Sequence, residues 1–393
     1  MNEISKIAPV AIWENFQKLC DTPRPSTKEE AVLQLLEKMA DAKGFAHFRD
    51  SGSNLVIMVP AKPGYEDRKM VILQANSGSS HNFDTDPIRM VMNGEWITAD
   101  NTTLGADNGI GAAAMMGIMT EDGLEHGPLE LLFTVDEERG LTGAMNLEPG
   151  RLKGDILLNL DTEDEYELCV GCAGGGDLVA TFNYAPVSVD AGFVARDIAL
   201  TGLKGGHSGI DIILGLGNAN KLMARFLRTA IRDLGAQIVT INAGTARNAI
   251  PRESFASVVL PADQASAFNT TLAAFGAAVK DEIGAIEPNF NIAAKDAELP
   301  STAMSASDSQ KFNNACVGAP NGVQAMSTSV EGVVETSINL AIIKLANGKA
   351  DVTLSARSSI NSARDSIREA ATAVFENIGA TVSWGDAYPG GRG

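Results

Sequence analysis

The sequence predicts a two-domain α/β protein, with an α/β domain first and a smaller α+β domain after it. The chain has 393 residues, which is long for one domain and comfortable for two. Hydrophobic residues make up 45% and charged residues 20%, enough apolar side chain for real cores. Up to about residue 187, strand-like apolar runs alternate with helical spacing, as in a sheet covered by helices. The pattern changes near Pro186.

In the first domain, residues 1–187, segments of both periods are visible. Val32, Leu36 and Met39 recur at helical intervals, whereas 71–73 is apolar and mostly β-branched, like a buried strand. The expected helices are 29–42 and 106–119, and the expected strands are 54–60, 70–75, 129–135 and 155–160.

The second domain, residues 188–386, is expected to place two helices on a small sheet and to contain no internal repeat. A Ser- and Asn-rich stretch, 301–329, divides it. A turn or crossing segment begins at Asp386, and residues 387–393 are expected to start a return to the first domain. The expected helices are 218–231 and 264–283, with a further helix at 362–378, and the expected strands are 195–203, 238–241, 255–260, 335–343, 350–356 and 380–384.

Composition excludes several classes of function. The net charge of −18 argues against nucleic acid, whose phosphates require Lys and Arg. No run of eighteen apolar residues predicts a membrane span, and the first residues lack a signal peptide, so a cytoplasmic protein is expected. The CxxC pair Cys169 and Cys172 has no second pair or nearby His pair, which favours reduced structural cysteines over zinc.

Three apolar segments of the first domain lead to acidic residues. Asp107 lies at the start of the helix 106–119, Asp136, Glu137 and Glu138 follow one strand, and Asp161 follows another. If these strands are parallel neighbours, the acids point into one crevice. Such a cluster requires cations or shifted protonation. It also suits metal-activated water, with a spare Glu to carry the proton.

Each acid alone is equally consistent with a solvated loop residue or a helix cap; their shared position at strand ends favours a site. Glu137 and Glu138 cannot face the same way, so one could ligate metal while the other handles water. Among the histidines, His47 and His126 lie in surface-like contexts. His207 is flanked by glycines and could reach a substrate, or could be structural.

Motifs in order along nearly the whole chain resemble those of the M20 metallopeptidases, and most closely the bacterial aminoacyl-histidine dipeptidases, which cleave Xaa-His peptides. Each motif is modest alone, and the set is specific. The matching segments are TTLGADNGIG (102–111), HGPLELLFTVDEERGLTGA (126–144), LLNLDTEDE (157–165), GCAGG (171–175), GLKGGHSG (202–209), GLGNANKL (215–222), RNAIPRE (247–253), PNGV (320–323) and GVVETS (332–337).

The resemblance implies a zinc-peptidase-like α/β catalytic domain holding two divalent metal ions, usually zinc, with manganese or cobalt possible, and a lid domain that pairs two subunits. It implies that Asp107 bridges the metals, that Glu137 is the general base, and that Glu138 and Asp161 each ligate one metal. His207 in the lid resembles the residue that steadies the oxyanion. The lid residues that would contact a small peptide substrate are His207, Asn248 and Arg357.

Two departures from the family pattern stand out. In the family, Gln-Ala is followed by His-x-Asp, which supplies a metal-binding His and its orienting Asp. Here Gln74–Ala75 leads to Asn76, and HNFDTDP (81–87) already matches what lies downstream, so an internal deletion is the economical interpretation. The second departure is the end at Gly393, before the family's remaining strands and last metal-binding His, which predicts a catalytic domain incomplete at its C-terminus.

The expected site keeps four carboxylates and loses both histidines. Two carboxylates per ion form a hard, all-oxygen environment that suits Mg, Ca or Mn better than Zn. The resemblance therefore implies metal-dependent dipeptide hydrolysis that is impaired in this chain. The alternatives are a non-catalytic, dimeric peptide-binding protein and a sequence artefact of an active parent.

Overall fold

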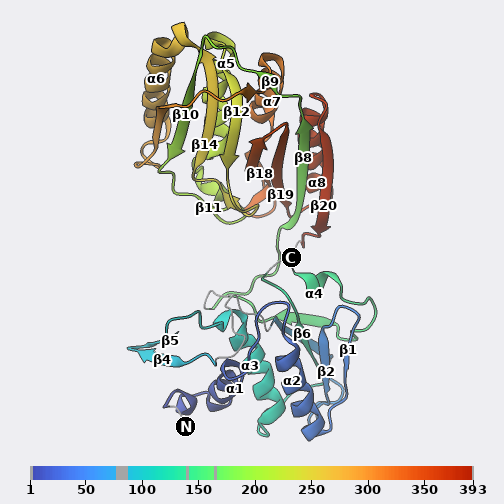
Figure 1. Ribbon diagram of the computed structural model, residues 1–393. Helices are drawn as coiled ribbons and strands as arrows, with labels where there is room; N and C mark the ends of the chain where they lie inside the picture. The colour runs from blue at the N-terminus through green and yellow to red at the C-terminus, as the bar shows by residue number, and fades with distance from the viewer. Residues whose placement is uncertain (1–2, 77–86, 139–140, 163–165, 392–393) are drawn as a thin grey trace. The chain divides into compact units, whose positions relative to one another are not determined.

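The computed structural model describes residues 3–76, 87–138, 141–162 and 166–391. The chain divides into two compact units, Met1–Leu168 and Cys169–Gly393 (Figure 1). The sequence prediction ended the first domain at residue 187. Strand β8 (Gly174–Asn183) pairs with β19 (Lys349–Ser358), however, so this strand belongs to the sheet of the second unit.

The first unit combines one main sheet with a hairpin and covering helices, and the segments predicted for it form within one or two residues of their expected ends. Its strands are β1 (His47–Arg49), β2 (Leu55–Val59), β3 (Val71–Asn76), β4 (Met90–Asn93), β5 (Trp96–Ala99), β6 (Leu129–Thr134) and β7 (Ile156–Asn159). Its helices are η1 (Glu3–Lys6), α1 (Val10–Cys20), α2 (Glu30–Lys43), α3 (Ala106–Thr120) and α4 (Thr142–Met145).

The main sheet has the order β1-β2-β6-β3-β7, and β3 runs parallel to both β6 and β7. Val71 lies opposite Leu129 on one side and Ile156 on the other, so the three strands end at the same edge of the sheet. Helices α1, α2 and α3 pack with the sheet around a core that includes Phe16 and Phe133. The two acid-bearing strands, β6 and β7, are therefore parallel, although β3 lies between them.

Strand β7 lies at the end of this order and is open on its outer side. Its side chains Ile156, Leu157 and Leu158 are 41%, 51% and 44% exposed. Apolar side chains of parallel strands are normally covered on both faces.

The second unit carries a larger antiparallel sheet and helices on it. Its strands are β8, β9 (Val187–Ser188), β10 (Phe193–Thr201), β11 (Gly206–His207), β12 (Gln237–Ala243), β13 (Ala249–Ile250), β14 (Ser254–Pro261), β15 (Asn291–Ala297), β16 (Thr302–Ala303), β17 (Gly322–Met326), β18 (Val334–Ala346), β19 and β20 (Thr381–Tyr388). Its helices are η2 (Asp211–Leu214), α5 (Ala219–Leu234), η3 (Ala262–Gln264), α6 (Ala265–Ile283), α7 (Ala306–Gly318) and α8 (Asn361–Glu376).

The strand order β15-β10-β14-β12-β18-β19-β8-β20 consists of two halves with the same path. In one half the chain runs β10-α5-β12-β14-α6-β15, and in the other it runs β8-α7-β18-β19-α8-β20. The first half is inserted between β8 and α7 of the second. The halves join where β12 pairs with β18, which is the second strand of each. No repeat is visible in the sequence, so only the fold reveals this duplication.

Two expectations for this unit were wrong. The expected small sheet with two helices is a long sheet with four longer helices, α5 to α8, and α7 lies in the Ser- and Asn-rich stretch. Ser305 caps α7 by accepting a hydrogen bond from the Asp308 amide, and Phe312 and Cys316 bury its inner face. The expected turn from Asp386 onward is strand as far as Tyr388.

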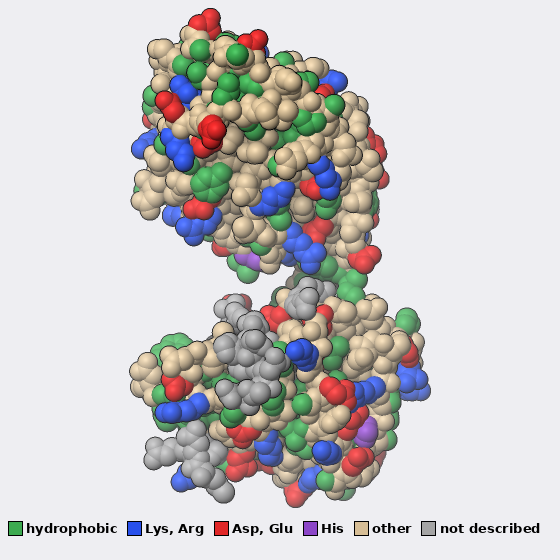
Figure 2. Space-filling model, viewed as in Figure 1, with side chains coloured by type: hydrophobic (Ala, Val, Ile, Leu, Met, Phe, Trp, Pro, Cys, Tyr) green, Lys and Arg blue, Asp and Glu red, His purple; other side chains and the backbone are tan. Residues whose placement is uncertain are grey.

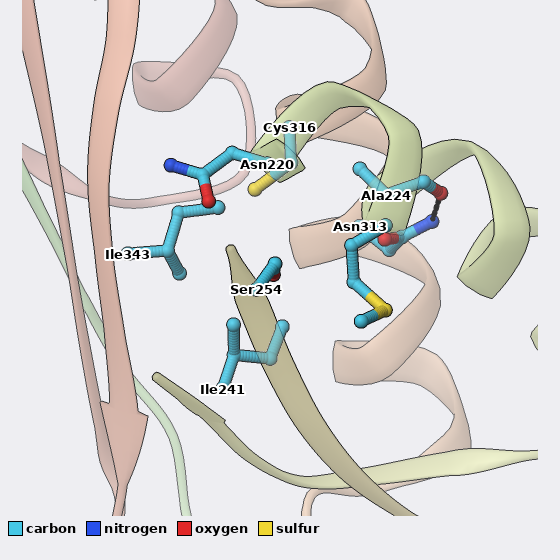
Figure 3. A pocket seen from close by; sticks show the side chains of 8 residues that line it. Asn220, Ala224, Ile241, Ser254, Asn313, Cys316 and Ile343 are labelled. Carbon is cyan, nitrogen blue, oxygen red and sulfur yellow. Dashed lines mark hydrogen bonds between the residues drawn. The ribbon is translucent and has the colours of Figure 1, made fainter. Parts of the chain in front are cut away.

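The core of the second unit contains a narrow internal pocket between α5, α7 and the sheet (Figure 3). Asn313 donates a hydrogen bond of 3.0 Å to the carbonyl of Ala224 there. The pocket has no room for a water molecule, and burial raises the pKa of its Cys316 thiol to about 12. It is therefore a packing feature rather than a catalytic site.

The surface of both units mixes acidic and basic side chains on the face that Figure 2 shows. Cys169 and Cys172, expected to be structural, are exposed free thiols. Among the described residues, no helix combines the length and hydrophobicity that crossing a bilayer requires.

Candidate active site

A cleft of about 270 Å³ opens in the first unit at the carboxyl edge of the sheet. Its wall comes from the ends of β3, β6 and β7 and from the turn that leads into α4. Parallel strands direct the residues that follow them to this edge, which is where α/β sheets bind ligands. The lining residues are Gln74, Thr134, Val135, Glu137, Leu141, Ala144, Asn159 and Asp161.

The turn after β6 separates the roles of its consecutive acids. Asp136 adopts a positive φ of 49°, and its carboxylate accepts a hydrogen bond of 2.7 Å from the Thr142 hydroxyl. The Asp136 amide donates to the buried carboxylate of Glu29 at 2.9 Å. Asp136 is thereby tied to the turn, and Glu137 lines the cleft while Glu138 is more exposed.

Asp107 enters from the start of α3, where the backbone leaves helical geometry at Asp107 and Asn108. The buried Asn108 side chain accepts a hydrogen bond of 3.1 Å from the Gly111 amide. A Cβ at Gly111 would lie 2.2 Å from Asn108 Oδ1 and 2.9 Å from the Leu160 carbonyl oxygen. Glycine therefore lets α3 approach the end of β7, and this approach brings Asp107 beside Asp161.

The four acids act on one another electrostatically. Burial raises the pKa of Asp161 to about 7, and a hydrogen bond with Asp107 adds to the shift. Burial also raises the pKa of Glu137, with the charges of Glu138 and Asp107 contributing. The pKa of Glu138 is raised by burial and by Asp107. The four predicted carboxylates thus lie within electrostatic range of one another, and a proton or a cation would relieve their mutual repulsion.

In the second unit, the structure brings the other three predicted residues to one end of the sheet. His207 in β11 lies opposite Ala249 of β13, and the Ser208 amide donates to the Asn248 carbonyl at 2.8 Å. Arg357 lies near the end of β19. Burial of the His207 ring lowers its pKa, and the positive charge of Arg357 lowers it further.

Sequence reasoning missed several residues of these two sites. Gln74 and Asn159 line the cleft. The only indication of this in the sequence was that each lies near the carboxyl end of a predicted strand. Tyr388 accepts a hydrogen bond of 3.0 Å from Arg357 Nη1. It escaped notice because 386–393 lacks the alternation of a strand. His81, in the segment HNFDTDP (81–87), lies outside the described residues.

An acid-lined cleft at the carboxyl edge of an α/β sheet, in a chain with a second unit built on an antiparallel sheet, is an arrangement typical of two-domain hydrolases. Residues 198–287 match the family model described as the peptidase dimerisation domain of the M20 type. The chain is 38% identical to the cytosol non-specific dipeptidase of Escherichia coli strain K12, over 99% of this chain and 82% of that protein.

The crystal structure of aminoacylhistidine dipeptidase from Vibrio alginolyticus aligns with a TM-score of 0.85 at 42% identity. The alignment covers 100% of this chain and 81% of that one. The chain belongs to the M20 peptidase family and is a dipeptidase-type member of it.

The donor set can be compared with the divalent metals that this family implies. The mutually raised pKa values mark a cluster of negative charge that a hard divalent ion would relieve, and carboxylate oxygens are ligands that such ions accept. Zinc prefers three protein ligands with nitrogen among them. Among the described residues, no three His, Cys, Asp or Glu side chains stand close enough together to hold a metal. The cluster therefore fits a weakly held hard ion better than zinc.

Proposed function

We propose that this chain is a metal-dependent dipeptidase that acts on Xaa-His peptides and that its activity is impaired. The observation that carries the proposal is the set of four interacting carboxylates, of which Glu137 and Asp161 line the cleft. Asp107, Glu138 and Asp161 would hold the divalent ions. A bound ion would supply the positive charge that lowers the pKa of the attacking water.

Glu137 is the general base of this proposal. It lines the cleft, and its raised pKa suits a group that takes a proton from water and returns it to the leaving amine. His207, Asn248 and Arg357 would contact the peptide from the lid. We also propose that the enzyme is cytoplasmic and forms a homodimer through the lid. The match of residues 198–287 to a dimerisation domain supports the homodimer.

The impairment rests on the segment after β3. Gln74–Ala75 continues directly into Asn76, Ser77 and Gly78, at the point where the family pattern has His-x-Asp and a deletion is inferred. An amide and a glycine supply no imidazole nitrogen and no carboxylate to orient one, and loss of orienting groups alone costs about 10–100-fold in metal affinity or activity. We therefore expect weak zinc binding and little turnover.

Restoring the motif tests this proposal without a change in length. The double substitution Asn76→His, Gly78→Asp should tighten zinc binding by about 10–100-fold and raise hydrolysis of β-alanyl-histidine. Calorimetric zinc titration and a hydrolysis assay measure both. The matched control, Asn76→Ala with Gly78→Asp, should do neither. Tight binding of two zinc ions with ordinary turnover by the unaltered chain would refute the impairment.

The second candidate function is a non-catalytic, dimeric peptide-binding protein. The observation that favours it is the well-connected cluster of His207, Arg357 and Tyr388 in the lid, which needs nothing from the missing motif. Binding of β-alanyl-histidine with no hydrolysis, even by the motif-restored variant, would favour this function over the first.

A further inference from the structure

Among the residues that the structure describes, one side chain forms a hydrogen bond with Arg357. Its Nη1 donates to the Tyr388 hydroxyl at 3.0 Å. Its Nε is buried and has no hydrogen-bond partner among the described residues. A charged donor that is buried and unpaired is costly, so this Nε–H is ready to meet an acceptor that a ligand brings.

His207 presents a second donor beside it. The amides of Gly209 and Ile210 both donate to His207 Nδ1, at 3.3 Å each. A nitrogen that accepts hydrogen bonds carries no proton, so the neutral ring has its proton on Nε2. Burial and the positive charge of Arg357 lower the pKa of His207 and favour this neutral ring, whereas Asp211 opposes them.

The other charged groups near His207 do not change the assignment of a neutral ring with its proton on Nε2. Asp211 Oδ2 accepts from the backbone amide of His207 at 2.7 Å, so that carboxylate is occupied by the main chain. Arg252 lies against Gly205, two residues before His207 in sequence, and adds a further positive side chain from the neighbouring segment.

Glycine at position 209 allows the two donors to come together. A Cβ at Gly209 would lie 3.1 Å from Arg357 Nε and 3.1 Å from His207 Cε1. Such contacts are tighter than ordinary van der Waals packing. The absence of a side chain at Gly209 therefore leaves the space in which the guanidinium and the imidazole approach each other.

Tyr388 is itself fixed from two sides. Its ring covers Gly175, where a Cβ would lie 2.5 Å from ring atom Cζ and from the hydroxyl oxygen. Its carbonyl accepts a hydrogen bond of 2.7 Å from Arg364 Nη1. The buried Arg364 and the flat glycine surface thus set the position of the phenol, which in turn sets that of Arg357.

We propose that Tyr388 is a positioning residue that fixes Arg357 so that its Nε–H and the Nε2–H of His207 together receive an anionic oxygen of the peptide substrate. The proposal rests on the proposed function, because Arg357 and His207 are its substrate-contacting residues. Tyr388 acts through Arg357 and not on the substrate itself.

The test removes only the hydroxyl, with Tyr388→Phe in the full chain. Nitrogen-15 NMR of the imidazole rings reports the pKa and the tautomer of His207, which is one of only four histidines. With Arg357 released, the pKa of His207 should rise toward about 6.5. The affinity for β-alanyl-histidine, measured by calorimetry, should fall about tenfold. The matched control is Tyr184→Phe, whose ring stacks on Phe182 in the same unit, and it should change neither.

The outcomes are separable. An unchanged pKa and tautomer of His207 in Tyr388→Phe overturns the positioning role. A raised pKa in a chain that does not bind β-alanyl-histidine supports the positioning role and counts against the proposed function.

Arg357→Gln provides a second variant in case Tyr388→Phe does not fold. It should raise the pKa of His207 by itself, and adding Tyr388→Phe to it should raise that pKa no further, because the two residues act in series. A full additional shift in the double variant would overturn the proposal.

Discussion

The two candidate sites of this molecule differ in charge: one is acidic and the other contains a cationic arginine. The first unit gathers Asp107 with three further acids, Glu137, Glu138 and Asp161, whose pKa values are raised by burial and by neighbouring carboxylates. The second unit gathers Arg357 and a neutral His207, each with a protein hydrogen-bond partner. The comparison shows that protein groups already hold these two side chains, whereas the acidic cleft needs a cation or protons from solution to balance its charge.

The largest expected effect is the loss of turnover when the general base of the cleft is replaced. In the motif-restored variant, Glu137→Gln should lower the turnover of β-alanyl-histidine by about 10²–10⁴-fold, because an amide cannot accept the proton of water. Steady-state kinetics measures it. Glu148→Gln, at a surface ion pair with Arg151, is the control and should keep turnover. Equal turnover in both variants would exclude Glu137 as the base.

A smaller effect tests how the cleft is assembled. Gly111→Ala should destabilise the first unit by about 1–3 kcal/mol, because the new methyl overlaps Asn108 Oδ1 and the Leu160 carbonyl. Thermal unfolding followed by circular dichroism measures the loss. Gly123→Ala places its methyl in open space and should be nearly neutral. Equal stability of the two variants would contradict the close approach of α3 to β7.

The third prediction uses the pKa of Asp161, which is about 7 in the folded chain against 3.8 for the free group. A raised pKa means that the folded state holds this proton more tightly, so the stabilisation is complete below about pH 4 and is lost as the pH rises through 7. In EDTA, the melting temperature of the first unit should fall between pH 5 and pH 8.

Two variants isolate that effect. Asp161→Asn carries no titrating carboxyl and should flatten the fall, whereas Asp155→Asn before β7 should keep it. Adding magnesium at pH 8 should recover part of the lost stability, because a cation replaces the proton. The idea fails if the melting temperature rises from pH 5 to pH 8 in EDTA.

The smallest expected effect tests whether the two sites are independent. Ser305→Ala removes the cap of α7 and should cost the second unit about 1 kcal/mol. Metal affinity of the cleft should stay the same, as a titration of the folded variant would show. Ser266→Ala within α6 is the control, because no hydrogen bond of its side chain caps that helix. A change in metal affinity would mean that the sites are coupled.

Much of the first unit was predictable from local pattern. The apolar segments 70–75 and 129–135 form strands at their expected places, and the acids after them meet because parallel strands end together. Helix α7 was missed because its burial depends on Phe312 and Cys316 facing a sheet whose strands are distant in sequence. Tyr388 was missed because its role depends on Gly175, more than two hundred residues earlier.

Strand β8 carries a consequence for how the molecule reaches its native state. Its Thr181 hydroxyl bonds to Asp351, 170 residues further along, and its other neighbour, β20, comes later still. The inserted half, β10 to β15, can close on itself first, whereas β8 has to wait for its partners. Such distant pairings slow folding. During synthesis on the ribosome, β8 would therefore remain unpaired until nearly all of the second unit had emerged.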